Sequence, residues 1–311
     1  MITTPSDTVQ LPNTDFDESM FSPPLPAKIQ KVQAMLQGNK VLVAFSGGVD
    51  SSVMLALALK YADAAVAVHF DSIFNSARER ENAERIAGML GVDLRMIDSD
   101  PLACEDIRKN PVNRCYYCKK ADYTELVHLK DALGYDMIVD GTNTDDLMDH
   151  RPGFQAMNSL GIRSPLLEAQ LVKAEIREIA RALYLPNSEK PGNPCLASRV
   201  MYGIEISRDM IERVDRAEEE IARTIDAKVI RARVHEHDLL RIELDRASLA
   251  QLLSGDASEL LDLGDRLKDL GFKKVSLDLE GYRTGSLNEL VDTLTPKLDT
   301  TDGQDDTPMP D

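Results

Sequence analysis

Residues 41–52 read Val-Leu-Val-Ala-Phe-Ser-Gly-Gly-Val-Asp-Ser-Ser, and they set the architecture of the chain. The run 41–45 has the composition of a buried β-strand, and 51–60 follows with helical spacing. Adjacent glycines between the two allow a tight turn that brings backbone N–H groups close to a ligand. Hydroxyl groups and the positive end of the helix meet at the same turn, which predicts a phosphate-binding loop.

Further along the chain, short apolar runs alternate with helical patterns. This alternation indicates a parallel sheet covered by helices on both faces, an α/β fold. The connection at 185–194, with three prolines and two asparagines, is expected to be a loop. Strands are expected at 41–45, 64–70, 93–97 and 137–139, and helices at 51–60, 77–90, 121–133 and 173–183.

A second pattern begins near residue 205. Ser207 can cap a helix over 208–225, and the elements after it mix both types. We therefore divide the folded chain into an α/β domain at 25–204 and a smaller C-terminal α+β domain at 205–292. In the second domain we expect strands at 228–234, 239–244 and 274–279, and helices near 248–253 and 257–270.

The chain is acidic, with 36 basic and 53 acidic residues and a formal net charge of −17. Much of this charge lies at the two ends, which are rich in Thr, Pro and Asp and show no apolar period. We expect disordered tails at 1–24 and 293–311. The region 25–204 is then nearly neutral, and no run of Lys and Arg exceeds two residues. A nucleic-acid partner is therefore not expected.

The sequence also favours one cellular compartment. No basic segment followed by an apolar run precedes the first domain, and no stretch approaches about 20 uninterrupted apolar residues. Four cysteines are too few for a disulfide framework in a chain of 311 residues. We expect a cytoplasmic protein with no membrane partner.

The loop at 46–52, Ser-Gly-Gly-Val-Asp-Ser-Ser, lacks the lysine and the glycine spacing of a Walker A loop and the GxGxxG dinucleotide pattern. It resembles the PP-loop of the ATP pyrophosphatases (the adenine nucleotide alpha hydrolase-like fold). The resemblance implies that ATP is cleaved between its α and β phosphates and that a substrate oxygen is adenylated. It implies ATP-binding roles for Ser46, Gly47, Gly48, Asp50, Ser51 and Ser52.

Two further segments fit an ATP site. Asp71 ends the second expected strand, where the superfamily holds adenine and ribose. Gly141 and Asn143 belong to an acidic run at 139–146 that ends a later strand at the same edge of the sheet. Asp50 and one acid of this run can hold Mg²⁺, which prefers oxygen ligands. Turn chemistry with a helix cap is the alternative interpretation of the run.

Three cysteines suggest sulfur or metal chemistry. Cys115 and Cys118 form a CxxC, and Cys195 stands in Asn-Pro-Cys-Leu-Ala-Ser-Arg. Three thiolates suit zinc or an iron–sulfur cluster, and three ligands on four irons leave one iron open. Cys104 can be a fourth ligand, although its apolar context favours a small buried residue. Nearby basic residues are expected to lower the thiol pKa values: Arg114, Lys119, Lys120 and Arg199.

These motifs together resemble the LarE family over roughly residues 25–290. Its members are ATP-dependent sulfur transferases that mature the nickel-pincer nucleotide cofactor of lactate racemase. The resemblance implies pyridinium-3,5-biscarboxylic acid mononucleotide as substrate, with each carboxylate adenylated and then converted to a thiocarboxylate. It rests on the PP-loop, the Asp140-Gly-Thr-Asn-x-Asp-Asp run, the Cys195-Leu-Ala-Ser-Arg199 motif with Tyr202-Gly203, and Arg231-x-Arg233-x-His235.

The family has two forms. In one, a single cysteine gives up its own sulfur and becomes dehydroalanine; in the other, three cysteines hold a [4Fe-4S] cluster that carries an extra sulfide. Cys115 and Cys118 place this sequence with the cluster form, with Cys195 as the third catalytic ligand. A sulfide or persulfide source and a homo-oligomeric assembly are the expected partners.

Arg231 and Arg233 alternate on an expected strand and therefore share a face. Two guanidinium groups side by side suit a substrate phosphate, whereas a solvated face paired to the acids at 218–220 is the alternative. The resemblance adds Arg199 and Glu219 to this phosphate site.

Two other functions remain open. A tRNA-thiolating enzyme can also combine a PP-loop with a three-cysteine cluster, and it predicts a wide basic surface. A non-catalytic nucleotide-binding protein with structural zinc predicts closed four-cysteine ligation that includes Cys104.

Overall fold

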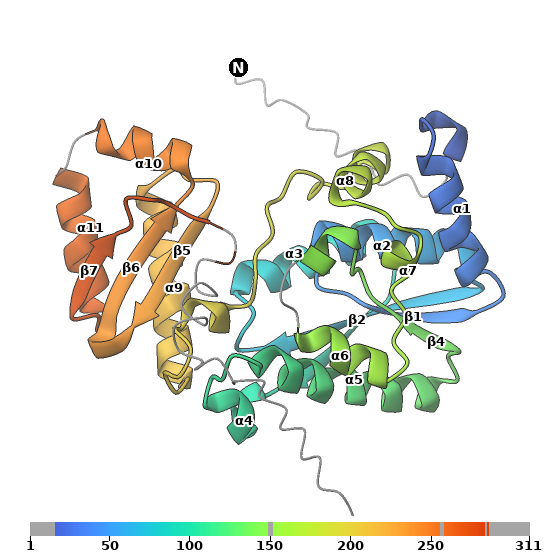
Figure 1. Cartoon of the computed structure of the whole chain (residues 1–311), viewed down its shortest axis with the longest axis horizontal. Coiled ribbons are helices and arrows are strands. Elements are labelled where there is room, and N and C mark those ends of the chain that lie inside the picture. Colours follow the sequence, from blue (N-terminus) through green and yellow to red (C-terminus); the bar gives the residue numbers. More distant parts are fainter. Residues whose placement is uncertain (1–15, 149–151, 256–257, 284, 286–311) are drawn as a thin grey trace, which may run out of the picture.

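The computed structural model describes residues 16–148, 152–255, 258–283 and 285, and it contains two units built on separate sheets (Figure 1). The expected tail at 293–311 lies outside the described residues. Of the expected tail at 1–24, residues 1–15 also lie outside the described residues. The expectation is wrong for the remainder, because residues 18–20 form a short 3-10 helix. Phe16 and Phe21 are buried and stack edge to face.

The first sheet is parallel and has the strand order β3-β2-β1-β4, which confirms the predicted α/β fold. Strands β2 and β3 follow β1 on one side of it, and the chain then returns to place β4 on the other side of β1. The strand order therefore reverses between β1 and β4. Ligands of open parallel sheets bind at the carboxyl ends of strands at such a reversal. The strands are β1 Lys40–Ala44, β2 Ala64–Ser72, β3 Leu94–Ser99 and β4 Met137–Val139.

Helices cover both faces of this sheet (Figure 1). Side chains of β1 alternate between two cores: Val41 and Val43 pack in the core that includes α2, and Leu42 packs on the opposite face with Tyr123 and Leu126 of α5. The α2 face carries α1 Leu25–Leu36, α2 Val49–Tyr61, α3 Ala77–Met89, α7 Pro165–Glu168 and α8 Lys173–Ala182, and the other face carries α5 Arg114–Leu133 and α6 Pro152–Ser159.

The second unit confirms the smaller α+β pattern. Its strand β5 (Ile230–His235) is antiparallel to β6 (Leu239–Leu244), which is parallel to β7 (Lys274–Leu277). The predicted cap is present, since the Ser207 side chain accepts a hydrogen bond from the Met210 amide at 3.2 Å. The helices of this unit are α9 Arg208–Thr224, α10 Arg246–Leu253 and α11 Ser258–Asp269.

Helix α5 begins at Arg114 rather than at residue 121, so both cysteines of the CxxC lie in its first turns. The sequence pattern missed this start because Tyr117 and Cys118 pack against the second unit instead of forming one apolar stripe toward the sheet. Helices α1, α6, α7 and the short α4 (Glu105–Arg108) were also not predicted.

The segment after Cys195 is shared between the units. Leu196, Ala197 and Val200 belong to the core of the second unit, although the sequence placed them in the first domain. The Met201 amide donates to the carbonyl oxygen of Val234 on β5 at 3.0 Å. Cys195 therefore lies at the junction of the two units. In the part of the chain that the structure covers, no helix combines the length and apolar character needed to span a bilayer.

Candidate active site

The PP-loop connects β1 to α2 and is packed against α3. Gly47 has a positive φ of +76°, and a Cβ there would lie 2.9 Å from the Cα of Ala83. The carbonyl oxygen of Gly47 accepts a hydrogen bond from the Asn82 side chain at 2.7 Å, and that of Gly48 accepts one from the Ser52 hydroxyl at 2.8 Å. Glycine is therefore required at position 47 by both conformation and space.

Asn187 supports the PP-loop, and the sequence analysis did not identify it. It lies in the predicted connection at 185–194 and is almost fully buried. Its side-chain nitrogen donates to the carbonyl oxygen of Gly47 and to the Ser52 hydroxyl, both at 2.9 Å. Asparagine in a proline-rich connection suggests a turn, so no local signal distinguishes this role.

Two serines bring polar groups to the start of α2. The hydroxyls of Ser46 and Ser51 lie 3.1 Å apart, and the Gly48 amide donates to the Ser46 hydroxyl at 3.3 Å. The first amides of any α-helix lack an acceptor within the helix, and its amino end is electropositive. The predicted residues therefore form a site suited to a phosphate or pyrophosphate.

Gly141 brings the end of β4 against this loop. A Cβ at Gly141 would lie 2.6 Å from the Ser51 backbone nitrogen, which is closer than side-chain carbons approach. Asn143 is buried beside it, and its side-chain oxygen accepts a hydrogen bond from the Asp145 amide at 3.0 Å. Gly141 thus borders the PP-loop directly, and Asn143 shapes the turn after β4.

Asp50 forms an ion pair with Lys173, a second residue that the sequence analysis missed. The Lys173 ammonium lies 2.5 Å from Oδ2 of Asp50, while Oδ1 is buried with no hydrogen-bond partner among the described residues. Burial raises the pKa of the Asp50 carboxyl, and Lys173 opposes that rise. Lys173 is the first residue of α8, where a positive charge is unfavourable because the amino end of a helix is itself electropositive. This unfavourable position was the sequence signal that could have indicated a nearby carboxylate partner.

The orphan oxygen of Asp50 fits a hard cation such as Mg²⁺. The acids that follow β4 are differently engaged. Asp140 accepts hydrogen bonds from the Thr142 hydroxyl at 2.6 Å and the Ser164 hydroxyl at 2.7 Å, and Asp145 accepts one from the Lys173 amide at 2.8 Å. These contacts favour the turn interpretation of the run at 139–146.

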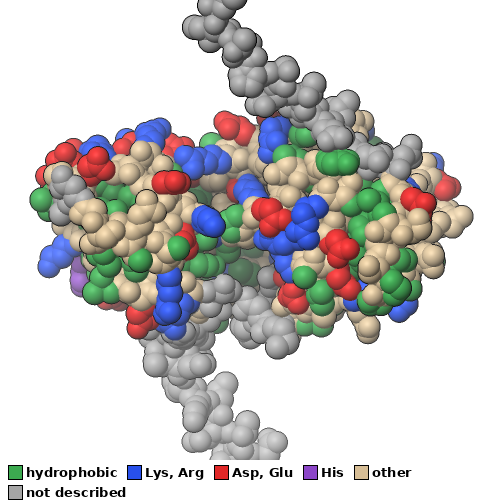
Figure 2. Space-filling view, turned by 90° about the horizontal axis from the view of Figure 1, so that it is seen from above, with side chains coloured by type: hydrophobic (Ala, Val, Ile, Leu, Met, Phe, Trp, Pro, Cys, Tyr) green, Lys and Arg blue, Asp and Glu red, His purple; other side chains and the backbone are tan. Residues whose placement is uncertain are grey.

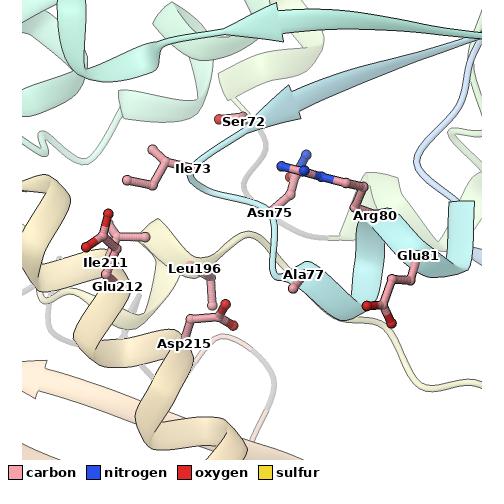
Figure 3. A pocket seen from close by; sticks show the side chains of 10 residues that line it. All are labelled: Ser72, Ile73, Asn75, Ala77, Arg80, Glu81, Leu196, Ile211, Glu212 and Asp215. Carbon is pink, nitrogen blue, oxygen red and sulfur yellow. The ribbon is translucent and has the colours of Figure 1, made fainter. Parts of the chain in front are cut away.

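Asp71 lies near the carboxyl end of β2 and forms an ion pair with Arg80 of α3. Beside it, a cavity of about 300 Å³ opens between the start of α3 and α9 (Figure 3). Leu196 lines this cavity opposite Ser72 and Asn75, so the residue after Cys195 borders the edge of the sheet where Asp71 lies.

The thiols of the CxxC lie close enough to Cys195 for their charges to interact. Cys115 and Cys118 lie one turn apart on the same face of α5. Burial raises the pKa of the Cys118 thiol well above its usual range, and repulsion from Cys195 adds to the rise. Cys115 stays exposed, yet the protein around its thiol and the nearby Cys195 raise its pKa as well. The expectation of low thiol pKa values is therefore wrong for Cys115 and Cys118.

The three thiols do not form a zinc site as they stand. Among the described residues, no three His, Cys, Asp or Glu side chains converge on a point where one ion could bind. Zinc–sulfur bonds of about 2.3 Å require such convergence, whereas each thiolate of a four-iron cluster binds a different iron. Cys104 is half-buried and packs against the core of the second unit, in line with its interpretation as a core residue.

Arg199 does not serve the predicted phosphate site in this arrangement. Its side chain is 0% exposed, and its Nε donates to Oε1 of Glu218 at 2.8 Å. The remaining donors bond the loop before and at the cysteine, including the Asn193 side chain at 2.7 Å and the Cys195 carbonyl oxygen at 3.2 Å. Arg199 therefore holds the cysteine segment and leaves no donor for a ligand.

Arg231 and Arg233 share a face of β5, as predicted, and both point to the cysteine segment. Arg233 pairs with Glu243 at 3.0 Å and donates to the Ser198 carbonyl oxygen at 2.8 Å. Arg231 donates to the carbonyl oxygens of Ile230 and Gly192. Burial and the neighbouring Arg199 lower the pKa of Arg231, which is the response of a cation short of negative charge. Arg231 is thus the arginine best suited to an anionic ligand.

The inward-facing acid of α9 is Glu218, and the assignment of Glu219 is corrected. Glu218 accepts hydrogen bonds from Arg199 and, at 3.1 Å, from the Ala232 amide. Glu219 instead faces Arg223 one turn along the helix at 3.4 Å. Three consecutive glutamates cannot reveal which one faces inward unless the phase of the helix is known.

The connection at 185–194 links the ATP loop to the thiols. It contacts the PP-loop through Asn187 and α3 through Lys190, whose ammonium lies 2.8 Å from Glu79. At its end, the Leu196 amide donates to the carbonyl oxygen of Phe74, just beyond β2, at 2.7 Å. Cys195 is therefore held at the same sheet edge as the PP-loop.

One face of the molecule carries side chains of both charges. On the face shown in Figure 2, Lys and Arg side chains are interspersed with Asp and Glu, and no basic surface extends across both units. Binding of a nucleic-acid duplex or of tRNA requires an extended basic surface. A parallel sheet with a PP-loop at its strand reversal and thiols at the same edge defines an ATP-using enzyme of the PP-loop class.

Comparisons with known proteins agree with this class. The family model of the queuosine biosynthesis protein QueC matches residues 40–110. A pyridinium-3,5-bisthiocarboxylic acid mononucleotide synthase of Lactiplantibacillus plantarum is 35% identical over 271 residues, covering 86% of this chain and 95% of that protein. An uncharacterised protein of Synechocystis is 40% identical over 254 residues, covering 81% of this chain and 93% of its own length. The chain belongs to the LarE family of ATP-dependent sulfurtransferases.

Proposed function

We propose that this protein uses ATP to convert the carboxylates of pyridinium-3,5-biscarboxylic acid mononucleotide to thiocarboxylates, with Cys115, Cys118 and Cys195 delivering the sulfur. The observation that carries the proposal is the hydrogen bond from the Leu196 amide to the carbonyl oxygen of Phe74, which holds Cys195 at the ATP edge of the sheet. The name of the Lactiplantibacillus relative supports the same reaction.

The first step takes place at the PP-loop. A substrate carboxylate oxygen attacks the α-phosphorus of ATP, pyrophosphate leaves, and an acyl-adenylate forms. Backbone amides at the start of α2 stabilise the leaving pyrophosphate through the charge of the helix terminus. Asp50 would hold Mg²⁺ through its unpartnered oxygen, and the ion would neutralise charge on the phosphates.

In the second step a sulfur nucleophile attacks the activated carbonyl carbon and AMP leaves. Cys115, Cys118 and Cys195 would hold a [4Fe-4S] cluster, which supplies an open iron for a sulfide when bound. Binding of metal would deprotonate these thiols, including that of Cys118, whose pKa burial raises. Arg231 faces the same junction and would bind the substrate phosphate.

We also propose a sulfide or persulfide donor as the partner that renews the site, and a homo-oligomeric assembly. The family relationship to a synthase of a pyridinium mononucleotide supports a small substrate over tRNA.

The test is anaerobic purification followed by assays of iron, zinc and acid-labile sulfide and by turnover with ATP, Mg²⁺ and the mononucleotide. We expect a brown protein, AMP release that depends on substrate, and a mass change of one sulfur for one oxygen at each carboxylate. Zinc without iron or sulfide would refute the cluster assignment. AMP release that ignores the mononucleotide would refute the substrate.

A further inference from the structure

Arg114 connects the two halves of the thiol site. It is the first residue of α5, immediately before Cys115, and its side chain is only 2% exposed. Its Nη1 donates to the carbonyl oxygen of Ala197 at 3.0 Å, two residues after Cys195. The same nitrogen donates to the side-chain oxygen of Asn110. The guanidinium therefore bridges the helix of the CxxC and the turn that follows Cys195.

Asn110 extends this bridge beyond the turn. It is fully buried, and its side-chain nitrogen donates to the Met201 carbonyl oxygen at 2.9 Å. Its own carbonyl oxygen accepts a hydrogen bond from the Gly203 amide at 3.0 Å. Arg114 and Asn110 thus hold residues 197–203 through Ala197, Val200, Met201 and Gly203, all from the side of the CxxC.

The surroundings of the Arg114 charge differ from those of the buried Arg199. Arg199 is paired with Glu218, whereas no carboxylate among the described residues forms an ion pair with Arg114. A buried cation without a counter-charge is unfavourable. The ionisable groups around Arg114 are the three thiols and Tyr202, so its charge is available to anionic sulfur.

We propose that Arg114 is the positioning residue of the sulfur site, holding Cys195 beside Cys115 and Cys118 so that the three sulfurs act on one bound group. The proposal deepens the proposed function and rests on it for the identity of that group. The proximity of the thiols, however, is a property of the chain and can be measured without ATP, cluster or substrate.

The experiment cross-links the metal-free protein with dibromobimane, which bridges two nearby thiols, and identifies the linked peptides by mass spectrometry. The wild type should give links from Cys195 to the CxxC as well as the Cys115–Cys118 link. In Arg114→Met, loss of the hydrogen bond to Ala197 should lower the Cys195 links about fivefold. The Cys115–Cys118 link should stay unchanged and serves as the internal reference.

Arg114→Lys should restore part of the Cys195 links, because one ammonium can donate both bonds but ends one covalent bond short of the position of Nη1. The matched control is Arg108→Gln, which removes an exposed arginine of α4 paired with Glu205 and should cross-link as the wild type does. Loss of the links in Arg114→Lys as severe as in Arg114→Met would overturn the proposal.

Undiminished Cys195 links in a folded Arg114→Met protein would overturn it directly. If thermal unfolding shows that Arg114→Met does not fold, Arg114→Gln takes its place with the same criterion. Sulfur transfer by the wild-type protein tests the proposed function separately from the role of Arg114. If the wild type transfers sulfur and the Arg114 variant keeps its Cys195 links, the role of Arg114 is refuted. If the wild type transfers no sulfur and the variant loses its Cys195 links, the proposed function is refuted.

Discussion

The ammonium of Lys173 lies 2.5 Å from Oδ2 of Asp50, and the two residues are 123 positions apart in the chain. This pair joins the first turn of α8 to the first turn of α2. It places one cation and one carboxylate where ATP and Mg²⁺ would bind.

Lys173→Met should lower ATP cleavage by about 10²-fold, the effect of losing one positioned charge at a phosphate site. It should also change the pH dependence. Burial already raises the pKa of Asp50, so the active, ionised carboxylate is lost as pH falls through that raised value. Without Lys173 the pKa rises further, and the acidic limb of the rate profile should move to higher pH. An acidic limb at the wild-type position would contradict this coupling.

Gly141→Ala should abolish ATP binding, because a methyl group 2.6 Å from the Ser51 nitrogen must displace the PP-loop. Gly264→Ala is the matched control. Gly264 lies in α11 with open space around its Cα, and alanine there should stabilise the protein by about 0.5–1 kcal/mol. Equilibrium binding of ATP and thermal unfolding check both variants. Normal ATP affinity in Gly141→Ala would show that β4 does not press on the loop.

Asn187→Ala should raise the KM for ATP about tenfold and cost about 1–3 kcal/mol of stability, since the buried carbonyl of Gly47 loses one donor. Asn158→Ala, at an exposed position of α6, should leave both unchanged. Steady-state kinetics of AMP formation and urea unfolding measure the two effects. Equal behaviour of the two variants would remove Asn187 from the ATP site.

Glu218→Gln should destabilise the protein by about 3–5 kcal/mol, because it leaves the fully buried Arg199 without its carboxylate. Glu219→Gln, one residue further along the same helix, should change stability by less than about 0.5 kcal/mol, because its partner Arg223 is largely exposed. Denaturant unfolding compares the two. A larger loss in Glu219→Gln would restore the assignment of Glu219 to the inner face.

Cys195→Ala should abolish sulfur transfer while substrate-dependent AMP formation survives, since adenylation occurs at the PP-loop. Cys104→Ala should keep both activities, because Cys104 packs in the core of the second unit. Thiocarboxylate formation is followed by mass spectrometry. Sulfur transfer by Cys195→Ala would refute its catalytic role, and loss of iron in Cys104→Ala would identify a fourth ligand.

The parts of this protein that were predictable from the sequence are local. The order of the strands, the PP-loop and the cap at Ser207 all depend on residues within a few positions of one another. Such features follow from backbone conformation and hydrophobic period, which a single sequence displays directly. Even the adjacency of Cys115 and Cys118 on one helical face needed only the start of α5.

The errors concern contacts between distant segments. The family resemblance implied that Arg199 binds a phosphate, yet folding brings Glu218 against it, and the hydrogen bonds of Arg199 are made within the chain. The neighbouring Arg231 donates only to carbonyl oxygens among its described hydrogen bonds, so no carboxylate occupies its donors. Identical side chains thus acquire opposite roles through their partners.

The sequence therefore determined the class of fold, the phosphate loop and the candidate sulfur chemistry, because short-range geometry and residue type are sufficient for these. Packing determined the rest: Asn187 bonds to the loop, Lys173 pairs with Asp50, and Arg114 bridges to the turn after Cys195. Buried polar groups must find partners wherever the fold places them, and the identity of those partners depends on segments that meet only in the folded chain.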